Sequence, residues 1–155
     1  MFNTFIIQFD KLIHFVFDKL NPNISNSTDP RVPIVLAPDS GPKLLSAIEV
    51  PIEKKESIVW LSATIGTFVE DSINPSRLIF TILRGNPNTG NIVFSTADSG
   101  QGGPTYRTST FTHVDQIKNY PSSKVTYYLT VQAVDNSENI NIIGPISFNG
   151  AEIKK

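Results

Sequence analysis

Apolar positions in the first twenty residues repeat at alternating steps of four and three, the heptad spacing of a helix with an apolar seam. The repeat consists of Phe2, Ile6, Phe9, Ile13, Val16 and Leu20. Phe5, Leu12 and Phe17 widen the stripe, so one helix could not hide it without a groove or a second copy of the chain. The pattern favours a helix over residues 1–20.

The same segment also alternates between apolar and polar side chains, as a β-strand does. The apolar members of this second pattern are Phe5, Ile7, Phe9, Ile13, Phe15 and Phe17. Aromatic and β-branched residues are common here, which suits a strand. Period alone therefore leaves helix and strand open, with the helix preferred.

The function of this apolar segment has three interpretations. It packs on its own domain, it couples copies of the chain as a helical stem or as a strand added to a neighbour's sheet edge, or it anchors the chain to a membrane surface. We expect coupling, because residues 21–42 separate the segment from the rest of the chain. The expected assembly interface is Phe2, Phe5, Ile6, Phe9, Leu12, Ile13, Val16 and Leu20.

Residues 21–42 form a proline-rich connector. They hold five of the eleven prolines: Pro22, Pro30, Pro33, Pro38 and Pro42. Such a stretch cannot form a helix or a central strand. It either runs extended as a linker or folds back along the domain as an edge segment, with Val32, Ile34, Val35 and Leu36 packing down.

Residues 43–155 are predicted to be one β-sandwich domain. Seven runs rich in β-branched and aromatic residues alternate with turn residues, at the spacing of a sandwich. The predicted strands span 45–52, 57–69, 78–83, 92–96, 106–113, 125–134 and 142–148. Alternation assigns their faces. It places Val125, Tyr127, Leu129, Val131 and Ala133 on one face, and Leu78, Phe80 and Ile82 opposite Ile79, Thr81 and Leu83.

Composition and charge narrow the classes of function. The net charge is −1 and neither sign clusters, so we expect no nucleic-acid partner. The chain has no cysteine, which excludes disulfides, thiolate metal sites and thiol catalysis. Asp10, Lys11, Asp18 and Lys19 interrupt the apolar start, so we expect neither a signal peptide nor a membrane span.

Side chains that catalyse reactions or bind metals are sparse. The two histidines, His14 and His113, lack partners at the spacing of a triad or a zinc site. Residues 135–139 cluster oxygen ligands of the kind that calcium prefers, but such clusters are typical of turns. Trp60 and Tyr127 lie in mainly apolar strands and are predicted to be core residues. We expect no catalytic residue, no metal and no cofactor.

Several short motifs in the body point to a known group of proteins. They are Ser46-Ala47-Ile48-Glu49-Val50, Gly66-Thr67, Leu78-Ile79-Phe80-Thr81-Ile82-Leu83-Arg84 followed by Ile92-Val93-Phe94, Asp115 with Tyr127-Tyr128-Leu129, and Gly144-Pro145-Ile146-Ser147-Phe148. Through them, residues 43–153 resemble the β-sandwich proteins of Bacillus-type spore surfaces, meaning exosporium proteins and endospore appendage (pilus) subunits. The resemblance implies a jelly-roll sandwich whose N-terminal segment reaches into the next subunit of a fibre. Several appendage subunits are cross-linked by disulfides, so the absence of cysteine implies a fibre held non-covalently.

The sequence therefore predicts an all-β, jelly-roll-like sandwich without enzymatic activity that assembles with itself, as a trimer or a head-to-tail fibre. By the resemblance, it would lie on a spore surface or another cell exterior, with other spore-surface proteins as further partners. The alternative function is a lectin-like or adhesin-like binding module. Its loops at residues 86–90 and 99–104 would contact a glycan or receptor, with Tyr106 or Tyr128 as aromatic contacts.

Overall fold

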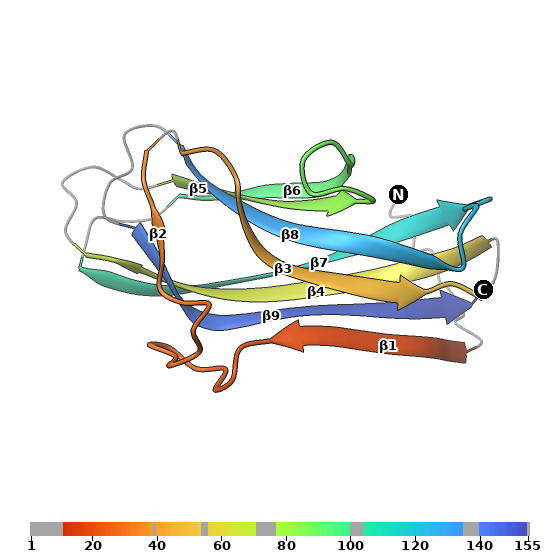
Figure 1. Cartoon of the computed structure of the whole chain (residues 1–155), viewed down its shortest axis with the longest axis horizontal. Helices are drawn as coiled ribbons and strands as arrows, with labels where there is room; N and C mark the ends of the chain where they lie inside the picture. The colour runs from red at the N-terminus through yellow and green to blue at the C-terminus, as the bar shows by residue number, and fades with distance from the viewer. Residues whose placement is uncertain are drawn as a thin grey trace, which may run out of the picture.

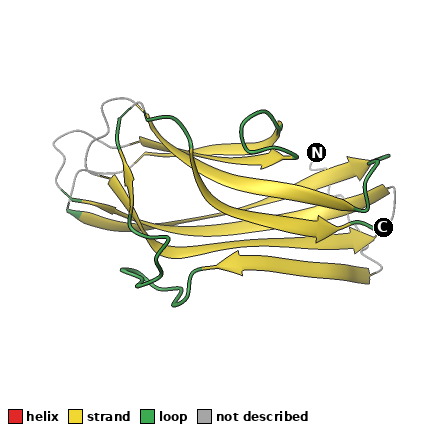
Figure 2. Ribbon diagram, in the orientation of Figure 1, coloured by secondary structure: helices red, strands yellow, loops and turns green. Residues whose placement is uncertain are grey.

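The structure is a computed structural model that describes residues 11–38, 40–53, 56–70, 77–99, 104–134 and 140–154. This part of the chain forms nine strands and no helix. The strands make two antiparallel sheets that pack face to face as a sandwich (Figures 1 and 2).

Sheet A has five strands, four of which lie side by side. In spatial order these are β1 (Lys11–Lys19), β9 (Ile140–Lys154), β4 (Glu56–Val69) and β7 (Thr105–Lys118). The short strand β2 (Ile34–Leu36) pairs with the beginning of β9. Since β1 pairs with the other end of β9, β1 and β2 share one edge of the sheet.

Sheet B has four strands. In spatial order they are β3 (Lys43–Pro51), β8 (Lys124–Val134), β5 (Arg77–Arg84) and β6 (Asn91–Ser99). From β3 onward the chain crosses repeatedly between the sheets, which is the order of a jelly roll. The predicted fold class, an all-β jelly-roll-like sandwich, is confirmed.

One hydrophobic core fills the space between the sheets. Its largest fully buried side chains include Leu61 and Phe148 from sheet A, and Phe80 and Tyr127 from sheet B. All seven strands predicted within residues 43–155 are present, and β7 and β9 are longer than predicted. The faces assigned by alternation to β5 and β8 are also confirmed, because the residues grouped on one face of each strand are buried together. Leu78, Phe80 and Ile82, and Val125, Tyr127, Leu129, Val131 and Ala133, are at most 2% exposed.

The helix favoured for residues 1–20 is wrong for residues 11–19, which form strand β1. Residues 1–10 lie outside the described part of the chain. A strand is possible here because pairing with β9 over eight residue pairs gives hydrogen-bond partners to backbone N–H and C=O groups that a helix would pair internally. The β-branched and aromatic residues of β1 also favour a pleated sheet.

The proline-rich connector follows the fold-back alternative rather than the extended one. Val32 and Leu36 are buried in the core, and Ile34 packs against it. Val35 points away and is 64% exposed. The connector therefore runs along the edge of sheet A between β1 and β3, as Figure 1 shows in red and orange.

A close approach of two glycines bends β9 where it passes from β2 to β1. A Cβ atom on Gly66 would lie 1.9 Å from the carbonyl oxygen of Gly144, so a larger residue does not fit there. Gly144 itself has φ of +91°, a conformation that other residues rarely adopt. The register between β4 and β9 shifts at this point, between Ile65 and Thr67.

Candidate assembly surface

Strand β1 presents large apolar side chains to solvent on the outer face of sheet A. Leu12, Phe15 and Phe17 are 58%, 54% and 58% exposed. The rings of Phe15 and Phe17 lie 6.1 Å apart between centroids. Burial of such side chains is favourable, so their exposure on the same face marks a candidate interaction site.

The row of residues through Phe15 stays apolar across the whole sheet. Phe15 pairs with Ala151 on β9, Ala151 pairs with Trp60 on β4, and Trp60 pairs with Val114 on β7. Trp60 is 37% exposed and Val114 is 41% exposed. Four adjacent strands therefore contribute to one apolar band.

A second apolar row lies beside the first, where Leu12 pairs with Ile153 and Ile153 pairs with Ile58. We call the combined surface the apolar patch. It consists of Leu12, Phe15, Phe17, Ile58, Trp60, Val114, Ala151 and Ile153. Within it, Ile58 and Ala151 are themselves buried, at 4% and 3% exposure. Of the ten large hydrophobic side chains exposed in the described part of the chain, five lie in this patch.

Polar side chains border the apolar patch. Across the sheet from Phe17, the neighbouring row consists of Asn149, Ser62 and Thr112. At the opposite border, Glu56 pairs with Lys118 at the ends of β4 and β7. An apolar centre with a polar rim is the composition of protein–protein interfaces.

The residues predicted as the assembly interface have different locations. Phe2, Phe5, Ile6 and Phe9 lie outside the described residues. Leu12 is in the apolar patch, and Ile13 is half-buried at a β-bulge between Leu12 and His14. Val16 packs against the core and Leu20 is fully buried in it. The predicted helical seam is therefore absent from residues 11–20, because a strand sends alternate side chains to opposite faces.

Sequence reasoning missed Phe15, Phe17, Trp60 and Val114 as interface residues, and it placed Trp60 in the core, which is wrong. The signal for Trp60 was present in the alternation of residues 57–69. Val59 and Leu61 are fully buried on the inner face, so Trp60 between them must face outward. Its pairing with Phe15 through β9 depends on tertiary register, which no local pattern contains.

The inner side of β1 is held by a buried carboxylate. Glu152 on β9 is fully buried, and its Oε2 atom lies 2.9 Å from Nδ1 of His14. Its Oε1 atom accepts hydrogen bonds from Ser57 Oγ at 2.7 Å and from the backbone N–H of Glu53 at 2.9 Å. This cluster connects β1, β9, β4 and the loop after β3 directly beneath the apolar patch.

The C-terminal end of β1 is held by Arg31 in the following loop. The Arg31 guanidinium donates to both carboxylate oxygens of Asp18, at 2.9 and 3.0 Å, and to the carbonyl oxygen of Lys19. Hydrogen bonds from the Arg31 side chain and backbone, and from the backbone N–H of Asn21, hold the pKa of Asp29 well below its usual range. Both ends of β1 are thus fixed to the sandwich.

Another buried carboxylate joins the two sheets. Arg84 Nη1 donates to both oxygens of Asp115 at 2.8 and 3.0 Å, and the Tyr127 hydroxyl donates to Asp115 Oδ2 at 2.7 Å. Burial, together with the Asp115 charge, raises the pKa of Tyr127 above its usual range. Tyr127 is a core residue, as predicted. His113 instead packs on Phe94, with ring centroids 5.2 Å apart.

The described residues show no metal-binding cluster and no membrane-spanning helix. Within the described ranges, no group of three or more His, Cys, Asp or Glu side chains is arranged to hold a metal ion. The candidate calcium turn at residues 135–139 lies outside those ranges. The described residues contain no helix of the length and apolar character needed to cross a membrane.

Comparison with known proteins gives information on the fold alone. No family model and no curated protein matches the sequence. Among solved structures, a chain of infectious bursal disease virus, Gx strain, superposes with a TM-score of 0.51 at 11% identity over 99% of this chain. This chain spans only 41% of that viral chain.

Two further solved structures are less similar. The Eiger TNF protein from S. frugiperda gives a TM-score of 0.44 at 12% identity, over 91% of this chain and 85% of that one. The module TmCBM61, solved with β-1,4-galactotriose, gives 0.38 at 13% identity, over 86% and 80%. At these identities, the chain shares with the viral protein a β-sandwich architecture and nothing more specific.

Proposed function

We propose that this chain is a structural subunit that assembles with copies of itself through the apolar patch of sheet A. The observation that carries the proposal is the continuous row from Phe15 through Ala151 and Trp60 to Val114. Monomeric proteins rarely leave five large apolar side chains exposed close together on one face, as the patch does. A second copy would bury the patch against an apolar surface of the same size.

The apolar N-terminal residues are also part of the proposed contact. Phe2, Phe5, Ile6 and Phe9 precede β1 in the sequence, and the proposal includes them in the contact between copies, as the sequence pattern predicts. The assembly that we propose is a trimer or a head-to-tail fibre, held non-covalently because the chain has no cysteine.

The resemblance of residues 43–153 to spore-surface proteins supports a proposal for the location of this assembly. We propose that it forms part of a spore-surface appendage or exosporium layer, with other spore-surface proteins as further partners. Antibody labelling of intact spores from the source organism tests the location. Surface labelling supports the proposal, and labelling only after spores are broken contradicts it.

Sedimentation velocity and negative-stain microscopy of the full chain test the assembly. We expect trimers or filaments at micromolar concentration. A monomer at every concentration would overturn the proposal. The variant Phe5→Ser with Phe9→Ser then tests whether the N-terminal residues take part, and we expect it to shift the population toward monomer.

A further inference from the structure

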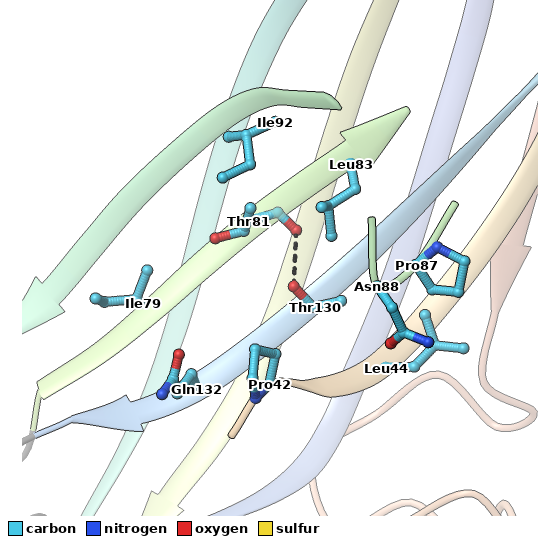
Figure 3. Close-up of a pocket in the computed structure, with 10 residues that line it drawn as sticks. All are labelled: Pro42, Leu44, Ile79, Thr81, Leu83, Pro87, Asn88, Ile92, Thr130 and Gln132. Atoms are coloured by element: carbon cyan, nitrogen blue, oxygen red, sulfur yellow. Dashed lines mark hydrogen bonds between the residues drawn. The ribbon is translucent and has the colours of Figure 1, made fainter. Parts of the chain in front are cut away.

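The outer face of sheet B, on the opposite side of the molecule from the apolar patch, carries a groove of about 430 Å³ (Figure 3). Thr81 on β5 and Thr130 on β8 form its floor. Leu44 on β3 and Ile92 on β6 flank the floor. The volume lies within the range of small-molecule sites, roughly 300–1,000 Å³.

A preformed loop closes one end of the groove. Pro87 and Asn88, between β5 and β6, line this end. The Asn86 side-chain oxygen accepts hydrogen bonds from the backbone N–H groups of Asn88 and Thr89, at 2.8 and 3.0 Å. The N–H of Gly90 donates to the Asn86 carbonyl oxygen at 2.9 Å. The loop is therefore fixed in position by its own hydrogen bonds, without any ligand.

The floor offers side chains but no free backbone. Strand β5 is paired on both sides, with β6 and β8, and β8 is paired on both sides, with β3 and β5. Their N–H and C=O groups are used in the sheet, so an extended peptide cannot add to them as a new strand. At the floor of the groove, a ligand is therefore recognised by side chains.

The lining combines aliphatic surface with uncharged polar groups. Ile79 and Leu83 present apolar surface next to the carboxamides of Asn88 and Gln132. The Thr130 hydroxyl donates to the carbonyl oxygen of Thr81 at 3.3 Å, which leaves its oxygen lone pairs available as acceptors. Among the described residues that line the groove, none is charged.

We propose that this groove binds a neutral oligosaccharide. Sugar rings carry an apolar C–H face and a rim of hydroxyl groups, and each carboxamide can donate to one hydroxyl while it accepts from the next. A charged ligand would lose hydration without gaining a counter-charge, and a hydrocarbon would leave the polar side chains unpaired. Tyr128 pairs with Leu83, one of the residues that line the groove.

This proposal does not depend on self-assembly, because the groove and the apolar patch lie on different sheets. It is tested by screening the full chain against an array of neutral and anionic glycans. Isothermal titration calorimetry then measures the affinity of the neutral oligosaccharide that binds most strongly on the array. We expect binding to neutral oligosaccharides and none to anionic ones.

Substitution of the two carboxamides locates the site. Asn88→Ala and Gln132→Ala should each weaken the binding about tenfold, because each loses the hydrogen bonds of one amide. Asn149→Ala, the same change on the outer face of sheet A, is the matched control and should leave affinity unchanged. No neutral oligosaccharide bound, or binding that survives both groove substitutions, would overturn the proposal.

Discussion

The two outer faces of the sandwich differ in chemistry although both belong to antiparallel sheets over the same core. The outer face of sheet A carries aromatic side chains in its centre, and Trp60 and Phe15 lie in one row across four strands. The outer face of sheet B carries threonines and aliphatic residues in its centre, with the 85–90 loop at one end. Leu83 faces outward there and is only 8% exposed.

This difference in surface chemistry indicates which kind of partner each face can bind. A broad apolar surface without polar anchors gains free energy only when another large apolar surface covers it. A narrow groove with paired amides and hydroxyls instead fits a small, neutral, polar ligand. Alternation places side chains inside or outside, but the residue types on the outside decide between these two uses.

The largest expected effect comes from substituting two aromatic residues on the outer face of sheet A. Phe15→Ser combined with Trp60→Ser should weaken self-assembly by about 4 kcal/mol, roughly a thousandfold in the dissociation constant, because buried aromatic side chains dominate interface energies. Sedimentation equilibrium measures the change.

The matched control makes the same kind of change on the other face. Leu44→Ser with Ile92→Ser removes two side chains that are 51% and 67% exposed on sheet B. It should leave assembly unchanged and weaken oligosaccharide binding. If both double variants lose assembly equally, the claim that only the outer face of sheet A is the assembly surface is contradicted.

A smaller effect is expected from the cluster beneath the apolar patch. His14→Ala removes one partner of the buried Glu152 carboxylate, so it should lower the free energy of unfolding by about 1–2 kcal/mol. Because β1 carries Phe15 and Phe17, assembly should weaken as well, while ligand binding on sheet B stays constant. Chemical denaturation and sedimentation measure the two changes, and unchanged stability contradicts the structural role given to His14.

Tyr127→Phe should act on the whole sandwich and on neither face in particular. It removes the hydroxyl that donates to Asp115, which keeps its two bonds from Arg84. We expect a loss of about 1 kcal/mol in unfolding free energy. Assembly and ligand binding of the folded protein should both be preserved, and a selective loss of either would show that Tyr127 supports one face alone.

The smallest expected effect is on the stability of the folded chain at acidic pH, through Asp29. The pKa of Asp29 is lowered in the folded protein, so the stability it contributes is present above the ordinary pKa of about 3.9 and is lost as pH falls below it. Thermal denaturation between pH 6 and pH 3 should show a smaller decrease for Asp29→Asn than for the unchanged chain. If the thermal stability of the two proteins falls equally with pH, the lowered pKa of Asp29 is contradicted.

The sequence was sufficient for the elements whose pattern is local. Alternation in residues 125–134 and 78–83 identified the strands and the residues that share a face, because successive side chains of a strand point to opposite faces. It was not sufficient for β1. There the spacing of Ile13, Val16 and Leu20 suits a helix equally well, and the edge of β9 that decides for a strand is more than a hundred residues away.

The candidate site was predicted only in part for the same reason. Leu12 was identified from the apolar stripe of the first segment, whereas Trp60 and Val114 join it through pairing with β9 and β4. Cross-strand neighbours of this kind follow from register, and register is a property of the folded sheet. The loop at the groove was easier to predict from the sequence, because glycine, proline and asparagine at residues 85–90 indicate a turn by themselves.

The most direct test of the assembly account uses Trp60, the only tryptophan in the chain, which lies in the centre of the apolar patch. Its emission maximum and its quenching by acrylamide would be followed over a dilution series, alongside the mass from sedimentation. We predict that the emission shifts to shorter wavelength and that quenching decreases as the mass increases. Assembly that leaves both properties of Trp60 unchanged would contradict the claim that the patch is the contact surface.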